Sequence, residues 1–201
     1  MQKPEFAKKF TKGMNSRGAY LAPHFASSFD FKNYNSMLDI AGGSGIYAAT
    51  VANLYDHLKV SVLERPPVDQ VARKSLQEFN SGNKVAVIPR DMFKDPLPAG
   101  YDIHLYSHVL HDWNAEQNKE LIRKSYQELN EGGSILILDA HLDKHKDGPV
   151  AVAEYSVLLM FATPGKCYSI GEMEHMLLEA GFKDIHYLPL VVNRSLIIGK
   201  K

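Results

Sequence analysis

The chain has 201 residues, 45% of them hydrophobic, which is enough for one domain with a full core. Lys plus Arg and Asp plus Glu number 23 each, so no net charge favours nucleic acid, a membrane surface or an acidic partner, and we expect a small ligand in a pocket. The single cysteine, Cys167, excludes an intramolecular disulfide and a multi-cysteine metal site, and it fits a reducing, cytoplasmic location.

The first 35 residues predict helices rather than a targeting segment. Charged residues interrupt every apolar pair of MQKPEFAKKFTKG, so this stretch is neither a signal-peptide core nor a membrane span, and we expect a soluble protein. Phe6, Phe10, Met14, Leu21 and Phe25 recur at spacings near one or two helical turns. These helices are expected to pack beside the ligand-binding edge of the sheet that follows.

Residues 36–201 alternate short apolar runs with amphipathic stretches, which predicts an α/β fold with a mostly parallel sheet and helices on both faces. Asn114 and Gln117 can cap one helix, which Gly132-Gly133 would close. The last two strands meet around Pro189, so they must pair antiparallel. The predicted strands are Met37–Ala41, Lys59–Glu64, Val85–Pro89, Tyr101–Tyr106, Ser134–Asp139, Lys183–Leu188 and Leu190–Gly199. The predicted helices are Ile46–Asp56, Val68–Asn80, Ala115–Glu131, Val150–Thr163 and Ile170–Ala180.

A glycine-rich turn follows the first predicted strand, in the sequence LDIAGGSG that runs from Leu38 to Gly45. Glycines there let a ligand approach the backbone, and the next helix offers free N–H groups. Asp39 is costly to bury near the end of a central strand unless it meets a polar partner. The cationic amino group of a sulfonium amino acid would supply one, whereas a pyrophosphate would be repelled. Alternatively, Asp39 only ties down the N–H groups of the turn.

The next two strand ends also carry polar side chains. Glu64 ends the second strand, nineteen residues after Gly45, where a carboxylate can accept hydrogen bonds from both hydroxyls of a ribose. Asp91, Met92 and Phe93 follow the third strand, and they offer one acceptor for an adenine amino group and two side chains that suit a ring face. Glu64 would serve either a sulfonium or a nicotinamide cofactor, or it could be a surface carboxylate, and the Asp91 segment alone would be an ordinary loop.

The fourth predicted strand is followed by SHVLHDW, which places His111 at the same sheet edge. A lone histidine in such a place is more often structural than catalytic. Several other histidines and acids are close in sequence, yet a metal enzyme is disfavoured and we expect no metal site. His104 and His108 lie too far apart along a strand to share one ion. The second group falls in what reads as a solvated loop, and its members are Asp139, His141, Asp143 and His145.

Taken in order, the segments LDIAGGSG, VLERPPV, RDMF, VLHDW, GGSILILD and AGF resemble the small-molecule O-methyltransferase family that includes caffeate, flavonoid and acetylserotonin methyltransferases and bacterial relatives. The resemblance spans about residues 6–199. It implies the class I S-adenosylmethionine-dependent methyltransferase fold, which is Rossmann-like, with seven strands and a terminal antiparallel strand. It also implies S-adenosylmethionine as methyl donor, S-adenosylhomocysteine as product and a small-molecule hydroxyl as acceptor.

Carried over residue by residue, the resemblance makes His111 the general base and Asp139 the acidic residue that orients it. A histidine is mostly neutral near pH 7 and can take a hydroxyl proton, and a carboxylate behind the ring fixes its tautomer. The residues implied to hold the cofactor are Asp39, Gly42, Gly43, Gly45, Glu64, Arg65, Asp91, Met92, Phe93, Ser107 and Trp113. The residues implied to face the substrate are Phe10, Met14, His108 and Met160.

The chain departs from the family pattern in several places. Ala41 replaces the first glycine of the turn, Ser107 replaces a lysine, and Cys167 falls where a second glutamate flanks the histidine. Family members also carry a preceding helical domain that dimerises and covers the partner's pocket. We expect residues 1–201 to form one methyltransferase domain without it. Three alternatives stay open: a stand-alone form with an open pocket, a form covered by a homodimer partner or a separate chain, and a fragment of a longer product.

Two other functions stay open from the sequence. One is a binding module for S-adenosylmethionine that has little or no catalytic activity. The other is a nicotinamide dehydrogenase, which only the pattern Gly43-x-Gly45-x-x-Ala48 supports and which Asp39 and the closing antiparallel strand disfavour.

Overall fold

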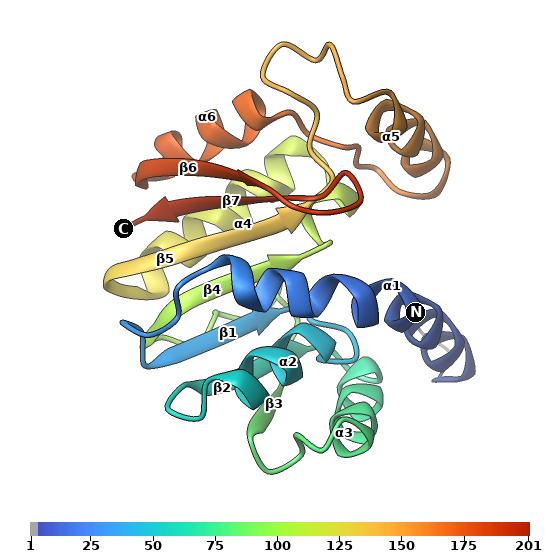
Figure 1. Cartoon of the computed structure of the whole chain (residues 1–201), viewed down its shortest axis with the longest axis vertical. Helices are drawn as coiled ribbons and strands as arrows, with labels where there is room; N and C mark the ends of the chain where they lie inside the picture. The colour runs from blue at the N-terminus through green and yellow to red at the C-terminus, as the bar shows by residue number, and fades with distance from the viewer. Residues whose placement is uncertain (1–3) are drawn as a thin grey trace.

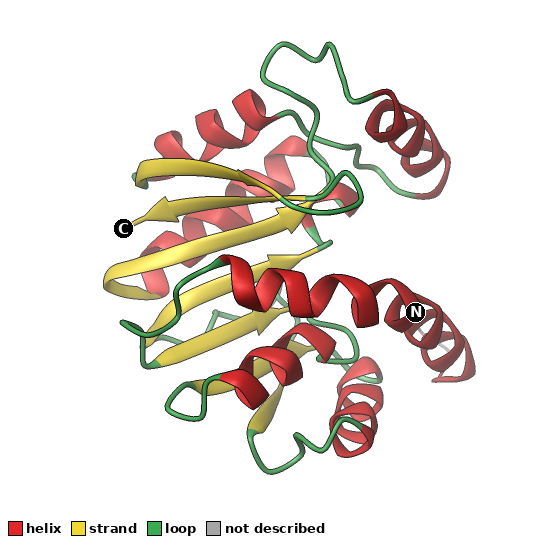
Figure 2. Cartoon of the chain, in the orientation of Figure 1, coloured by secondary structure: helices red, strands yellow, loops and turns green. Residues whose placement is uncertain are grey.

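The computed structural model describes residues 4–201, and within them the side chains of residue 11 and of residues 13–201. Figure 1 shows the course of the chain, and Figure 2 its helices and strands. The strands are β1 Ser36–Ile40, β2 Lys59–Glu64, β3 Val85–Pro89, β4 Tyr101–Ser107, β5 Leu129–Asp139, β6 Lys183–Pro189 and β7 Ser195–Lys200. The helices are α1 Pro4–Ser28, α2 Ile46–Leu54, α3 Val68–Glu78, α4 Ala115–Glu128, α5 Val150–Ala162 and α6 Ile170–Ala180, with the 3₁₀ turn η1 Leu110–Asp112.

The strands form one seven-stranded sheet in the order β3-β2-β1-β4-β5-β7-β6. The five strands from β3 to β5 are parallel, whereas β7 is antiparallel to both β5 and β6. The predicted closing hairpin is therefore confirmed. Because parallel strands point the same way, the carboxyl ends of β1, β2, β4 and β5 all meet at the right-hand edge of the sheet in Figure 1.

Alternation along the strands divides the core into two layers. Met37, Ile103 and Leu105 pack with residues of α1, α2 and α3, on one face of the sheet. Leu38 and Tyr106 point the other way and pack with residues of α4 and α6. This period of two is what a sheet buried on both faces requires. In Figure 2, α1 and α2 lie in front of the sheet and α4 lies behind it.

The N-terminal segment is a single helix of 25 residues, α1, where the sequence predicted several helices. Its second half supplies Leu21, Ala22 and Phe25 to the core, and Phe25 meets the rings of Phe31 and Tyr47 edge to face at 5.9 and 6.0 Å. Side chains of Phe6 and Phe10 lie outside the described residues. No helix within residues 4–201 combines the length and apolar character needed to cross a membrane.

Two predicted element ends are wrong for an identifiable reason. The helix that begins at Ala115 has the predicted Asn114–Gln117 capping box but ends at Glu128, and β5 begins at Leu129. Gly133 lies inside β5, where a Cβ would come 2.8 Å from the carbonyl oxygen of Asp102. Gly133 therefore allows a close backbone contact within the sheet, and the glycine pair does not close a helix. The last strand begins at Ser195 rather than Leu190, because residues 190–194 form the turn.

Phe25 gives a direct test of this packing. We expect Phe25→Ala to lower the free energy of unfolding by about 3–5 kcal/mol, because it empties a fully buried ring site. Leu54→Ala is the matched control, since that side chain is 59% exposed at the end of α2 and its loss should change stability by less than about 0.5 kcal/mol. Urea unfolding followed by circular dichroism measures both. Equal effects of the two variants would contradict the placement of α1.

Candidate active site

The turn after β1 has the left-handed backbone that its glycines predict. Gly43 and Gly45 have φ of 63° and 77°, in the left-handed region that glycine enters freely. Ala41, which replaces the family's first glycine, has φ of 55° and must bear the cost of its Cβ there. At Gly42 a Cβ would lie 2.5 Å from Oδ2 of Asp39. Only a residue without a side chain fits over this carboxylate.

Asp39 is fully buried and incompletely paired. Its Oδ1 accepts a hydrogen bond from Oγ of Ser107 at 3.3 Å, and its Oδ2 has no partner among the described residues. Burial raises the pKa of this carboxyl to about 7, although the hydrogen bond from Ser107 opposes the shift. A buried oxygen without a donor is a cost to the free protein. It is also a site at which a cationic or hydrogen-bond-donating ligand gains free energy.

Glu64 braces the same turn from the neighbouring strand. Its Oε1 accepts the N–H of Gly43 at 3.0 Å, and its Oε2 accepts the N–H of Arg65 at 3.0 Å. Burial raises the pKa of Glu64 to about 7 against these two hydrogen bonds. Each carboxylate oxygen keeps a free lone pair. The side chain can therefore accept further donors, such as a pair of hydroxyls, without releasing the turn.

The loop after β3 forms the next part of the edge. The side chain of Asp91 accepts the N–H of Phe93 at 3.0 Å, and the Phe93 ring meets that of Trp113 edge to face at 4.7 Å. Met92 is buried beneath them. A cavity of about 460 Å³ lies beside this loop, between the ends of β2 and β3, and its lining includes Arg65 and Asp91. These sequence-predicted residues are thus brought together.

His111 and Asp139 form a buried pair at the ends of η1 and β5. Nδ1 of His111 donates to Oδ1 of Asp139 at 2.6 Å, and the N–H of Ala140 donates to the same oxygen at 2.8 Å. Burial alone would lower the pKa of His111, but the Asp139 carboxylate outweighs it and raises that pKa above its usual value. His111 in turn holds the pKa of Asp139 well below its usual range despite burial. Nε2 remains as the outward nitrogen, 3.5 Å from Oδ1 of Asp112.

His108 lies against the same carboxylate. Its φ is 56°, and its N–H donates to the carbonyl oxygen of Leu138, so the chain turns sharply after β4 and brings the ring back over the sheet edge. Its Nδ1 is 3.6 Å from Oδ1 of Asp139, and neither ring nitrogen has a hydrogen-bond partner among the described residues. The side chain is 5% exposed. Burial lowers the pKa of His108 to about 4, so its imidazole is neutral at pH 7.

The segment that carries His111 is held by contacts that the sequence did not reveal. Nδ2 of Asn118 donates to the carbonyl oxygen of Leu110 at 2.9 Å. The hydroxyl of Tyr168 donates to the backbone carbonyl oxygen of Trp113 at 2.7 Å. A Cβ on Gly165 would come 2.0 Å from the carbonyl oxygen of His111. The loop after α5 therefore packs directly on the backbone of the histidine and fixes its position.

Tyr155 is a site residue that the sequence analysis missed. Its ring meets that of His111 edge to face at 5.7 Å, and its hydroxyl accepts a hydrogen bond from Arg17 of α1 at 3.3 Å. Helix α5 is apolar on nearly all sides, so its sequence does not show which face points inward. The spacing of Val152, Tyr155 and Leu159, at i, i+3 and i+7, is the signal that could have identified that face.

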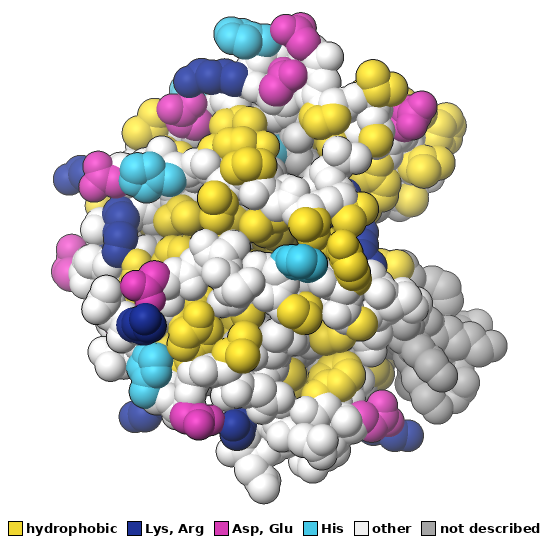
Figure 3. Space-filling model, in the orientation of Figure 1, with side chains coloured by type: hydrophobic (Ala, Val, Ile, Leu, Met, Phe, Trp, Pro, Cys, Tyr) yellow, Lys and Arg dark blue, Asp and Glu magenta, His cyan; other side chains and the backbone are white. Residues whose placement is uncertain are grey.

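The predicted substrate-facing methionines lie on the helices that flank this edge. Met14 on α1 is 41% exposed and Met160 on α5 is 68% exposed. Figure 3 shows apolar side chains gathered on the surface over α5. The side chain of Phe10 lies outside the described residues.

Cys167, at the position where the family pattern has a second flanking glutamate, is buried and uncharged. The residue packs in a small buried cluster with Ala140, Val152 and Leu159. Burial raises the pKa of its thiol to about 12, so it is neutral at any ordinary pH. The expectation that residues 139–145 lie in a solvated loop is also wrong for two of them, because Asp139 and His141 are buried.

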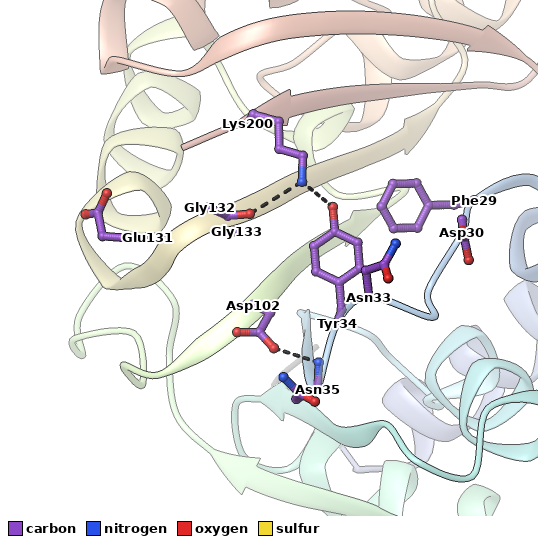
Figure 4. A pocket seen from close by; sticks show the side chains of 10 residues that line it. All are labelled: Phe29, Asp30, Asn33, Tyr34, Asn35, Asp102, Glu131, Gly132, Gly133 and Lys200. Atoms are coloured by element: carbon purple, nitrogen blue, oxygen red, sulfur yellow. Dashed lines mark hydrogen bonds between the residues drawn. The ribbon is translucent and has the colours of Figure 1, made fainter.

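A second hollow lies at the opposite edge of the sheet, and its polar groups are already paired. This cavity of about 400 Å³ is lined by residues before β1 and around the start of β5, which Figure 4 shows from close by. Nζ of Lys200 donates to the hydroxyl of Tyr34 at 2.6 Å, and Asp102 accepts the N–H of Asn35 at 2.7 Å. At the carboxyl edge, by contrast, Oδ2 of Asp39 and both ring nitrogens of His108 are buried without a partner among the described residues, which makes that edge the candidate active site.

Comparison with known proteins agrees with this geometry. A family model described as an O-methyltransferase domain matches residues 1–183. An L-tyrosine C(3)-methyltransferase from Streptomyces lavendulae is 32% identical over 183 residues, which are 90% of this chain and 50% of the relative. Acetylserotonin O-methyltransferase from Gallus gallus is 28% identical over 96% of this chain and 55% of the relative. The chain thus spans about half the length of these relatives.

Solved structures show the same fold. An O-methyltransferase family 2 protein from Planctomyces limnophilus, in complex with apigenin, matches with a TM-score of 0.94 and 31% identity over 100% of this chain and 62% of its own. Human N-acetylserotonin methyltransferase, in complex with S-adenosylmethionine, matches with a TM-score of 0.89 and 26% identity over 97% of this chain and 55% of its own. The sheet is therefore that of an S-adenosylmethionine-dependent methyltransferase. With 183 of its 201 residues matched by the family model, the chain belongs to the O-methyltransferase family.

Proposed function

We propose that the chain transfers a methyl group from S-adenosylmethionine to a hydroxyl of a small molecule, with His111 as general base. One observation carries the proposal: the adjacent residues Ser107 and His108 connect a candidate cofactor-binding carboxylate and a candidate catalytic base at one edge of the sheet. Ser107 donates to the unpaired carboxylate of Asp39, and His108 lies beside the Asp139 carboxylate that orients His111. A cation-binding carboxylate and an oriented base are the two parts that this transfer needs.

The residues present fit S-adenosylmethionine. The unpartnered Oδ2 of Asp39 suits the α-amino group, and the bare backbone at Gly42 leaves room for the ligand's approach. Glu64 suits the ribose hydroxyls, and the loop of Asp91, Met92 and Phe93 suits the adenine. Structural neighbours solved with S-adenosylmethionine and with S-adenosylhomocysteine support this choice. When bound, the sulfonium supplies an activated methyl group, so the protein needs no further electrophile.

His111 supplies the proton chemistry. Because its Nδ1–H is donated to Asp139, the lone pair of the neutral ring is on Nε2, which can accept the proton of an acceptor hydroxyl. Asp139 then stabilises the imidazolium, and because it is ionised it need not change charge itself. A phenol-like acceptor gains nucleophilicity as its proton leaves. The acceptor's other atoms would lie under α1 and α5, where Arg17 and Tyr155 connect the two helices above His111.

The exposed apolar face of α5 supports a covered pocket. Val157, Leu158, Met160 and Phe161 are between 53% and 87% exposed, in a protein whose relatives are about twice as long. We infer that a further chain segment, or a second copy, covers this face and completes the acceptor site, because isolated large apolar patches are rare on monomers.

Asp39 makes cofactor affinity pH-dependent. Binding the ammonium group requires the ionised carboxylate, and the pKa of Asp39 in the protein without ligand is about 7. Affinity for S-adenosylhomocysteine should therefore rise as the pH rises from 5.5 toward 7.5. Isothermal calorimetry should show Asp39→Asn binding at least about 10-fold more weakly at pH 7.5, with a smaller pH dependence. Asp56→Asn, at an 84% exposed side chain, is the control. Unchanged affinity in Asp39→Asn would remove Asp39 from the site.

His111 should act on turnover and not on the cofactor. We expect His111→Gln to lower kcat by about 10²–10⁴-fold and to leave the Kd for S-adenosylhomocysteine within about 3-fold, because Gln keeps the size but cannot take a proton. His175→Gln, at a side chain 77% exposed, is the control. A panel of phenolic acceptors, with products assigned by NMR, gives the measurement. Full activity of the variant would exclude the base, and a methyl group placed on carbon would exclude the O-transfer.

Asp139 sets the pH at which the base becomes neutral. Its carboxylate raises the pKa of His111, so kcat/KM in the wild type should rise with pH through a midpoint above the usual histidine value of about 6.5. In Asp139→Asn, burial is no longer opposed by that charge, and the pKa of His111 should fall below about 6.5. Heteronuclear NMR of the imidazole nitrogens measures both values. A higher pKa in the variant would contradict the pairing.

A further inference from the structure

His108 is the least satisfied side chain at this edge. Both of its ring nitrogens are buried and lack a hydrogen-bond partner among the described residues, although the ring lies 3.6 Å from a carboxylate that already accepts two hydrogen bonds. The hydroxyl of Tyr47, whose ring is 6.0 Å from that of His108, is also unpartnered. A buried imidazole with free lone-pair capacity is costly unless something binds it. Its neighbours indicate what that is.

One ligand atom each from His108, His111 and Asp139 lies within 4.8 Å of the other two. Two imidazoles and one carboxylate form a donor set that binds divalent transition metals, including Zn²⁺ and its spectroscopic substitute Co²⁺. We propose that these three residues bind a divalent transition-metal ion, and that the ion switches the methyltransferase site off. The site differs from a catalytic metal centre, because the ion takes the Nδ1 nitrogen of His111 and the Asp139 oxygen whose hydrogen bond orients the base.

The distances between these donor atoms are close to what such an ion needs. With bonds of about 2.0–2.2 Å, neighbouring donors of a tetrahedral ion stand roughly 3.3 Å apart. Nδ1 of His108 is already 3.6 Å from Oδ1 of Asp139. Nδ1 of His111, at 2.6 Å from the same oxygen, must move outward, and as the metal–nitrogen bond forms its proton passes through solvent to Nε2, so that the ring stays neutral. A water molecule would take the fourth position.

The inhibition follows from the tautomer and rests on the proposed role of His111. A neutral imidazole has one N–H, and metal coordination at Nδ1 leaves that proton on Nε2. Nε2 can then no longer accept a proton from the acceptor hydroxyl. The ion also replaces the hydrogen bond by which Asp139 orients the ring.

Metal binding is measured without methyl donor or acceptor, so the test does not depend on turnover. Protein stripped with EDTA is titrated with Zn²⁺ by calorimetry, and with Co²⁺ by its visible absorption. We expect one ion per chain, with affinity at least about 10-fold weaker in His108→Ala and in Asp139→Asn. His175→Ala, which removes an exposed histidine 4.0 Å from Glu179, should bind as the wild type does. Unchanged affinity in His108→Ala would overturn the proposal.

A second measurement uses the wild-type chain alone, in case a variant fails to fold. X-ray absorption of the zinc-loaded protein should show nitrogen and oxygen ligands with two imidazoles. A sulfur ligand would place the ion at Cys167, and a single imidazole would place it on the surface; either result contradicts the site. If Zn²⁺ binds as described while kcat is unaffected, the metal site stands and the base assignment fails. If an active chain binds no Zn²⁺, the metal site fails and the base assignment stands.

Discussion

The candidate site depends on a buried carboxylate at the end of β1 that the protein leaves half unpaired. Oδ2 of Asp39 has no donor among the described residues, and Gly42 keeps the space above it free of side-chain atoms. Such a group destabilises the free protein, since burial opposes its charge. The cost is understandable if a cationic ligand removes it. Cofactor affinity and protein stability are thus opposed at one residue.

The parallel sheet turns this local feature into a site. Because β1 and β4 are neighbours, the residues after β4 necessarily reach the ligand that Asp39 would hold, and Ser107 and His108 extend that contact to Asp139 and His111. Binding and proton transfer are then coupled through adjacent residues of one turn. The left-handed backbone of His108 makes that turn tight enough to bring its ring back to Asp139. Strain at this point is therefore part of how the site is assembled.

The sequence predicted most of the sheet, because two-residue alternation and short apolar runs leave few other folds. It also predicted the His111–Asp139 pair, though only through a resemblance to known enzymes, since the two residues are 28 positions apart. It could not predict Tyr155, because an almost wholly apolar helix does not reveal its inner face. It misplaced the end of α4, because a pair of glycines is also typical of a helix end, whereas Gly132 and Gly133 both lie within β5, where Gly133 makes a close backbone contact.

The sequence also could not predict that His108 lies beside His111 and Asp139. Spacing along an ideal strand separates His104 from His108, and it says nothing of a residue whose backbone leaves the strand at positive φ and folds back. Tertiary geometry, not sequence distance, places His108 with His111 and Asp139.

The most direct test of the central claim is a crystal structure of this chain with S-adenosylhomocysteine. Our account predicts the ligand's α-amino group within hydrogen-bond distance of Oδ2 of Asp39, its ribose on Glu64 and its sulfur facing the His111 side of the edge. A ligand bound elsewhere, or Oδ2 of Asp39 still without a donor while the ligand occupies the edge, would contradict it.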